Sequence, residues 1–195
     1  MTAKPTDRAA AVRKAMRTVV AERGFHGASM SAVAREAGVA TGTAYTHYAS
    51  KDELVLAAYS ETKEELGREA TSGIHPDSPP EQRFLVLWLA YYAYLRRNPD
   101  DARFLLQVDS SPYRSRAHEA ALADESDAVV KQVMMPDLAT LLLPLPADVL
   151  YDLALGPAVR LAAAGQDLVP GQLEEIAAAC WRAITRPSRA GAPAS

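Results

Sequence analysis

The stretch Phe25–Leu54, FHGASMSAVAREAGVATGTAYTHYASKDEL, carries the spacing and the capping residues of two short helices joined by a tight turn. Ser29 is a typical cap in front of the first helix, and Gly38 supplies the left-handed residue that ends it. Val39 fills the corner, and the second helix is expected to begin near Thr41. Apolar residues recur at helical spacing in the first helix, at Met30, Val33, Ala34 and Ala37. The stretch therefore predicts a helix-turn-helix.

The second of these helices presents hydrogen-bonding side chains that suit base edges and phosphates better than a core. They are Thr41, Thr43, Tyr45, Thr46 and His47, with Lys51 close by. Tyr45 is expected on phosphate, because Ala44 and Tyr48 already serve for packing on so short a helix. Lys51 stands at a helix start, where the dipole disfavours a cation, so a phosphate partner explains it better than local stability does. His47 is balanced between a DNA contact and a plain surface role.

Composition favours a soluble helical protein. The chain has 195 residues, of which 49% are hydrophobic, and alanine is frequent while β-branched runs are scarce. The longest apolar run, Phe84–Leu95, is too short to span a bilayer, and charged residues interrupt any apolar segment near the start. Cys180 is the single cysteine, so no intramolecular disulfide can form. We expect a cytoplasmic protein without a membrane partner, a cofactor, a metal site or catalytic residues.

Charge is distributed unevenly along the chain, whose net charge is −3. Residues 1–55 hold eight Lys or Arg and five Asp or Glu, a net charge of +3, and the other 140 hold thirteen and nineteen, a net charge of −6. A basic amino-terminal part on an acidic remainder is expected where only the first part meets phosphates.

Helical periodicity continues to the end of the chain, and no segment predicts a strand. Nine or ten helices are expected, at about residues 7–23, 31–37, 41–48, 51–72, 80–97, 100–108, 111–135 with a possible kinked continuation to 143, 147–164 and 171–184. Gly24 is expected to end the first, and Ser50 with Glu53 forms a capping box for the fourth. The predicted fold is all-α: a head with the helix-turn-helix (residues 1–50), a helical-bundle body (residues 51–186), and a disordered tail (residues 187–195).

The body offers candidates for a dimer interface and for a pocket. The last two helices carry apolar stripes longer than each helix needs, which favours packing against a second copy. The interface candidates are Leu150, Leu153, Pro157, Leu161, Ile176, Cys180, Trp181 and Ile184. The helix at 80–97 is apolar nearly all round yet carries polar tips that need partners, as do the walls of a ligand pocket. The pocket candidates are Phe84, Trp88, Tyr91, Tyr92, Phe104, Tyr113 and Met134, for each of which plain core packing is an equal alternative.

The order of motifs over about Val12–Leu54 resembles the TetR family of bacterial transcriptional regulators. The motifs are Ala21–Phe25, Ser29–Ala34, Ala37–Val39, Gly42–Tyr45 and Ser50–Leu54, and the body adds only a Gly156-Pro157 dipeptide. Where the family commonly has a serine capping the recognition helix, this chain has Ala40, so Thr41 is a candidate both for that cap and for DNA. Position 44 is alanine where a larger aliphatic residue is usual.

The resemblance implies a homodimer on double-stranded DNA, with two heads in successive major grooves of a palindromic operator and a small-molecule effector in the body. The resemblance also places Gly42 on the recognition surface. With Ser29, the DNA-binding candidates are Ser29, Thr41, Gly42, Thr43, Tyr45, Thr46, His47 and Lys51. The expected function is a repressor released by a small, largely apolar effector. The alternative is an effector-independent DNA-binding or protein-interaction module whose body only dimerises, and an enzyme has no specific motif to support it.

Overall fold

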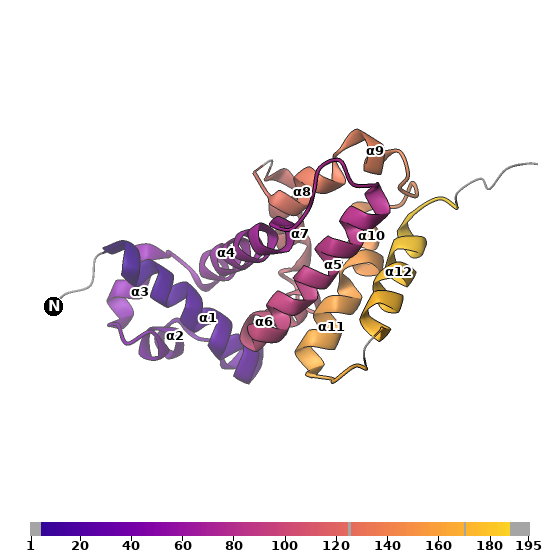
Figure 1. Cartoon of the computed structure of the whole chain (residues 1–195). Coiled ribbons are helices and arrows are strands. Elements are labelled where there is room, and N and C mark those ends of the chain that lie inside the picture. The colour runs from indigo at the N-terminus through magenta and orange to yellow at the C-terminus, as the bar shows by residue number, and fades with distance from the viewer. Residues whose placement is uncertain (1–4, 125, 170, 188–195) are drawn as a thin grey trace, which may run out of the picture.

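The computed structural model describes residues 5–124, 126–169 and 171–187, and the chain is all-α there (Figure 1). The only β pairing among these residues is an isolated bridge between Leu142 and Thr185. The helices are α1 (Pro5–Gly27), α2 (Met30–Glu36), α3 (Thr41–His47), α4 (Lys51–Thr71), α5 (Pro80–Arg97), α6 (Pro99–Asp109), α7 (Arg114–Ala123), α8 (Ala128–Val133), α9 (Pro136–Ala139), α10 (Ala147–Ala154), α11 (Gly156–Ala164) and α12 (Gln172–Ile184). The all-α prediction is confirmed. The predicted disordered tail lies outside the described residues except for its first residue, Pro187.

The head, with α1–α3, lies at one end of the molecule, and α4 leads from it into the body (Figure 1). Val12, Met16 and Val19 of α1 are fully buried, as their spacing predicts. Gly24 breaks α1 with φ of 65° and ψ of 179°, a conformation that is essentially restricted to glycine and costs another residue about 1–3 kcal/mol. The chain then makes one further turn to Gly27 before α2 begins.

Two predicted helices are each divided in the structure. The helix expected at 111–135 is interrupted between α7 and α8, where the Asp127 carboxylate accepts hydrogen bonds from the backbone N–H groups of Val129 and Val130 at 2.7 and 2.9 Å. An aspartate that caps a new helix competes with continuation of the old one. The helix expected at 147–164 is interrupted at Leu155, because Pro157 cannot donate a backbone hydrogen bond and suits a first turn.

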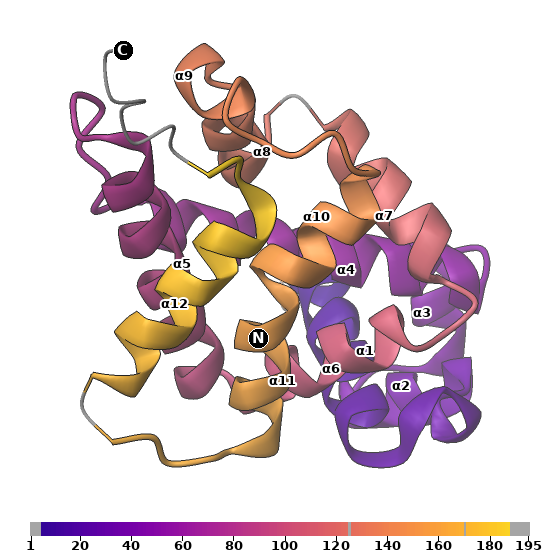
Figure 2. The ribbon, with the colours of Figure 1, turned by 90° about the vertical axis from the view of Figure 1, so that its right-hand side faces the viewer.

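Helix α5 runs through the centre of the body, with α4 on one side and α11 and α12 on another (Figures 1 and 2). Trp88, Tyr91 and Leu95 are completely buried there, and the Trp88 indole donates a hydrogen bond of 2.9 Å to the carbonyl of Ala154. None of the helices in the described segments is long and apolar enough to cross a membrane.

Candidate nucleic-acid interface and internal cavity

The turn between α2 and α3 has the predicted local structure. The Ser29 hydroxyl accepts a hydrogen bond of 3.1 Å from the backbone N–H of Ala32, and Gly38 has φ of 66°. Met30, Val33 and Ala34 are buried, so α2 rests on the core of the head with its polar side outward. The position and direction of α3 therefore follow from one cap, one glycine and one apolar face.

Helix α3 buries one face and exposes the other. Ala44 is completely buried, whereas Tyr45 is 52% exposed, and Thr41, Gly42 and Thr46 are also exposed. Thr43 and His47 are half-buried at the edges of the exposed face. The recognition-surface candidates thus lie together on one accessible helix.

The absence of a serine before α3 has a visible consequence. Ala40 is the N-cap, no side chain caps this helix, and Thr41 is its first helical residue. Thr41 therefore does not take over the cap, and its exposed hydroxyl is left for another partner. At the end of α3 the Tyr48 side chain is buried, and its hydroxyl accepts a hydrogen bond of 2.6 Å from Arg13 of α1.

Lys51 has a partner inside the protein that the sequence did not reveal. Its ammonium donates a hydrogen bond to the backbone carbonyl of Phe25 and lies 5.8 Å from the centre of the Phe25 ring. The carbonyls that end a helix lack intrahelical partners, so a cation is favourable at this place. Lys51 ties α4 to the end of α1, with ammonium donors remaining for a phosphate.

The start of α4 is also held by the body. The Tyr113 hydroxyl donates a hydrogen bond of 2.8 Å to Asp52, and Arg116 lies 3.3 Å from the same carboxylate. The Tyr113 and Phe25 rings are 4.9 Å apart. Burial, with the hydrogen bond to Asp52, raises the pKa of Tyr113 to about 12. Tyr113, a pocket candidate from the sequence, lies at this junction and not in the cavity described below.

A second junction joins α1 to α4, α5 and α6 through charges. Arg17, which is buried, lies 3.2 Å from carboxylate oxygens of both Glu61 and Asp101, and Arg13 also pairs with Glu61. Asp101 further accepts a hydrogen bond of 3.0 Å from the Tyr94 hydroxyl. Burial raises the pKa of Asp101 above its usual range, and Arg17 opposes this shift.

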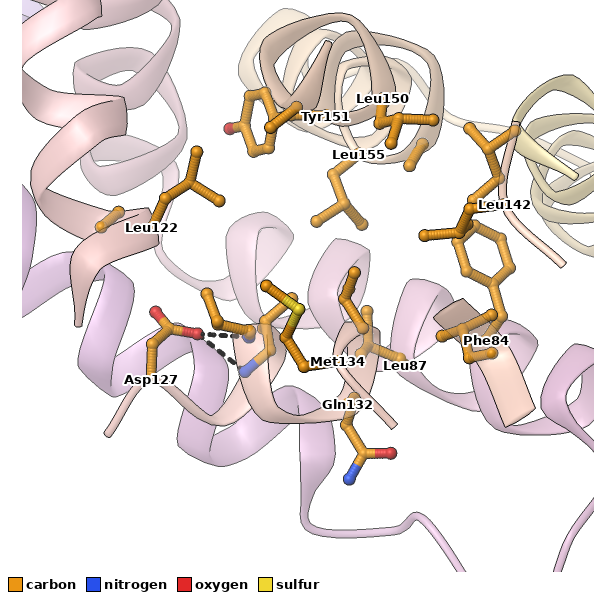
Figure 3. Close-up of a pocket in the computed structure, with 18 of the residues that line it drawn as sticks. Phe84, Leu87, Leu122, Asp127, Gln132, Met134, Leu142, Leu150, Tyr151 and Leu155 are labelled. Carbon is orange, nitrogen blue, oxygen red and sulfur yellow. Dashed lines mark hydrogen bonds between the residues drawn. The ribbon is translucent and has the colours of Figure 1, made fainter. Parts of the chain in front are cut away.

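A cavity of about 170 Å³ lies in the body and is lined mainly by α4, α5, α7, α8 and α10 (Figure 3). It is partly open to solvent, since Leu122 and Met134 of its wall are 48% and 67% exposed. Apolar side chains form most of its wall, among them Leu87, Leu122, Leu142, Leu150 and Leu155. Phe84 and Met134 from the predicted set line it. The other candidates have different surroundings: Trp88, Tyr91 and Phe104 are completely buried, and Tyr92 stacks on Trp88 with ring centres 6.0 Å apart.

Several polar groups of this wall were missed from the sequence: Tyr59, Lys63, Arg83, His118 and Tyr151. One signal could have pointed to the first two. Tyr59 and Lys63 are four residues apart on the buried face of α4. The sequence therefore places a lysine at a position of the helical period where an apolar residue is expected. The others required knowledge of which helices pack together.

The predicted dimer residues lie on α10–α12, which face the viewer in Figure 2. Leu153 is exposed, and Leu150, Pro157, Leu161 and Ile176 are half-buried. Cys180, Trp181 and Ile184 are buried within the single chain. No group of three metal-binding side chains gathers among residues 5–124, 126–169 and 171–187.

Comparison with known proteins agrees with this architecture. A family model described as bacterial regulatory proteins, tetR family, matches residues 12–58, and one described as tetracyclin repressor-like, C-terminal domain, matches residues 79–185, more than half of the chain. An uncharacterized HTH-type transcriptional regulator of Haemophilus influenzae is 28% identical over 185 residues, which are 93% of this chain and 97% of that protein.

Solved structures extend the likeness to three dimensions. A TetR-family transcriptional regulator from Haemophilus influenzae has a TM-score of 0.73 at 27% identity, covering 93% of this chain and 98% of its own. A putative tetR family regulator from Shewanella sp. PV-4 has a TM-score of 0.75 at 22% identity, covering 92% and 98%, and shows the fold alone. The family consists of transcriptional regulators that bind DNA and typically dimerise. This chain belongs to the TetR family and is a helix-turn-helix transcriptional regulator.

Proposed function

We propose that this regulator is a homodimeric repressor that leaves a palindromic operator when a small, largely apolar effector enters the cavity. The observation that carries the proposal is the course of α4. This helix begins at Lys51, just after α3 ends at His47, and farther along it contributes Tyr59 and Lys63 to the cavity wall. At 1.5 Å per residue, about 18 Å of continuous helix joins Lys51 to Lys63.

The exposed face of α3 is the proposed reading surface. Base edges are assigned to Thr41, Gly42, Thr43, Thr46 and His47, phosphates to Tyr45 and Lys51, and Ser29 holds the start of α2 beside them. Two such surfaces in a dimer must lie about 34–36 Å apart, or a multiple of that distance, to read two half-sites. A modest displacement of α4 would change that spacing and weaken binding.

The proposed dimer interface is the face of α10–α12 seen in Figure 2. Leu153 and Val149 are each 37% exposed on α10, and a face on which exposed apolar residues gather suits a protein partner. A second copy of this chain is the proposed partner. Cys180, Trp181 and Ile184 would support the interface from behind, because they already pack inside the protomer.

Selection of operator sequences tests the DNA-binding part. Purified protein is incubated with random duplexes at stated salt, because phosphate contacts dominate the affinity. We expect an enriched palindrome. The Tyr45→Phe variant should bind this palindrome more weakly and keep the melting temperature of the original chain. Lys14→Met, at an exposed position of α1, is the control for loss of a surface group and should keep the original affinity. No enriched sequence from folded, dimeric protein would favour a protein-interaction module, and full affinity of Tyr45→Phe would exclude the phosphate contact.

The second candidate is a regulator whose body only dimerises. A solid core would favour it, and the cavity beside α4 is the reason that the effector-responsive function is preferred. The two differ in one measurement. An effector must lower operator affinity by the factor by which DNA lowers effector affinity, whereas a purely dimerising body has no such reciprocal pair.

A further inference from the structure

Lys63 is a buried cation in the cavity wall that forms no ion pair with any of the residues that the structure describes. Lys63 is only 7% exposed. Within the described part of the chain, no carboxylate oxygen lies within 4.0 Å of its ammonium nitrogen. The ammonium lies 3.5 Å from the Tyr91 hydroxyl and 5.4 and 5.1 Å from the ring centres of Tyr91 and Tyr151. Withdrawing an ammonium from water without a counter-ion is unfavourable.

The other charged groups of the wall are already compensated. Arg83 forms a bidentate pair with Asp137 at 2.7 and 2.8 Å, and His118 lies 2.9 Å from a carboxylate of α6. Asp127 caps α8 through two backbone N–H groups, and Asp148 is exposed to solvent. Asp127 lies near enough to favour the charged form of Lys63. Among the described residues, however, Lys63 is the charged group of the wall that makes no direct ion pair, so a ligand in the cavity can supply one.

The Tyr151 hydroxyl is a second unused polar group beside Lys63. This oxygen is buried and has no hydrogen-bond partner in the described part of the chain. Burial, with Tyr91 and Asp109 nearby, raises the pKa of Tyr151 well above its ordinary value, so the hydroxyl keeps its proton and can donate. Burial lowers the pKa of Lys63, whereas the Tyr91 hydroxyl and the Asp127 carboxylate favour the ammonium form, and the net shift is upward.

The cavity has a polar end and an apolar end. In Figure 3 Tyr151 lies toward one end with Leu122 and Asp127, and Phe84 and Leu142 lie at the opposite end. A ligand that satisfies both ends carries one negative charge and an apolar body. The volume of about 170 Å³ is close to that of cavities which hold one benzene molecule, about 150 Å³.

We infer that the cavity binds a small organic acid, with its carboxylate on the Lys63 ammonium and the Tyr151 hydroxyl and its apolar body toward Phe84 and Leu142. The body of this acid is the size of one aromatic ring or a short alkyl chain. That the acid acts as the effector rests on the proposed function, whereas its binding does not. Two charge-assisted contacts in an apolar cavity discriminate strongly against a neutral molecule of the same shape.

Calorimetric titration with matched acids and amides tests this inference. Benzoate and hexanoate are compared with benzamide and hexanamide on the full chain. We expect each acid to bind about 10- to 100-fold more tightly than its amide, as expected for contacts with a charged partner. Equal affinity of acid and amide, or no binding of either acid, would overturn the inference.

Two variants locate the preference, and a third is the control. In Lys63→Met the preference for acid should disappear while the amide still binds, which shows that the cavity is intact. Tyr151→Phe should weaken acid binding about 3- to 10-fold. Lys131→Met changes an exposed lysine on α8 and should behave as the original chain does. Persistence of the acid preference in Lys63→Met would refute the assignment.

Operator binding in the presence of the same compounds separates the two proposals. If the acids bind through Lys63 but leave operator affinity unchanged, the organic-acid site stands and the effector role falls. If the amides release the operator and the acids do not, the effector role stands and the organic-acid site falls.

Discussion

Replacement of Arg17 by methionine should loosen the attachment of the head to the body. Arg17 reaches from α1 to Asp101 on α6 and to Glu61 and Glu65 on α4, and the Arg17 and Asp101 side chains are each only 10% exposed. The variant keeps an unbranched apolar stem but removes the guanidinium, which leaves Asp101 buried without its cation. Glu61 keeps its pair with Arg13, so the main cost arises at Asp101.

The expected loss of unfolding free energy is about 3 kcal/mol. Removal of one member of a buried pair typically costs about 3–5 kcal/mol, and the lower end applies here because Tyr94 still donates a hydrogen bond to Asp101. For a chain of this size the melting temperature should fall by about 6–12 °C, measured by calorimetry at one fixed protein concentration. The control is Arg103→Met, which removes an exposed arginine from α6, the helix that carries Asp101. This variant should change the melting temperature little.

The loss in Arg17→Met should shrink as the pH falls from 7 toward 5. Burial raises the pKa of Asp101 in the folded state above its unfolded value, so the folded state takes up a proton more readily and gains stability as the pH falls through the folded pKa. Arg17 lowers that pKa, and its removal therefore strengthens the effect. The double variant Arg17→Met with Asp101→Asn should recover most of the stability at pH 7. If it does not, or if Arg103→Met is equally destabilising, the buried charge is not the cause.

Three further changes test the head and its junction. Ser29→Ala should lower the unfolding free energy by about 1 kcal/mol in chemical denaturation, because it removes the cap of α2, while Ser60→Ala, at an exposed position of α4, should not lower it. Gly38→Ala should cost about 1–2 kcal/mol in the same assay, since a Cβ is strained at φ of 66°, and an unchanged midpoint would show that the turn can relax. Tyr113→Phe should lose the hydrogen bond to Asp52 and lower the protection of the first turn of α4 from hydrogen exchange, whereas equal protection would show that this bond does not hold the turn.

Local signals explain which parts of the fold could be predicted from the sequence. Caps, one left-handed glycine and the apolar face of α2 specify the helix-turn-helix within about 30 residues, so the chain neighbourhood alone contains the information. The divided helices show the limit of periodicity. Asp127 reads as an ordinary surface residue of a long helix until its carboxylate is seen to cap α8.

The cavity could not be predicted from the sequence, because its wall is assembled from seven helices that are spread over the chain from Tyr59 to Ile184. Trp88 and Tyr91 have the polar tips of pocket residues, but Trp88 finds a carbonyl on α10 and both are buried in the core. Periodicity says that such a residue faces inward, not whether it meets a neighbour or a void. Lys63 and Tyr151 face the same space because α4 packs against α7 and α8 and because Tyr151 of α10 approaches the Lys63 ammonium.

The geometry around α4 also limits how strongly the body can control the head. Its first turn is held through Asp52 by Tyr113 and Arg116, which precede or belong to α7, and the same helix α7 carries His118 and Leu122 into the cavity wall. Under the proposed function, a ligand that displaces α7 would strain these partly exposed contacts. Each is of the kind that contributes about 0.5–1.5 kcal/mol, so together they can transmit about 1–3 kcal/mol, which corresponds to a roughly 5- to 150-fold change in operator affinity. A much larger effect would require movement at the buried Arg17 junction as well, and the Arg17→Met variant would then respond to ligand less than the original chain does.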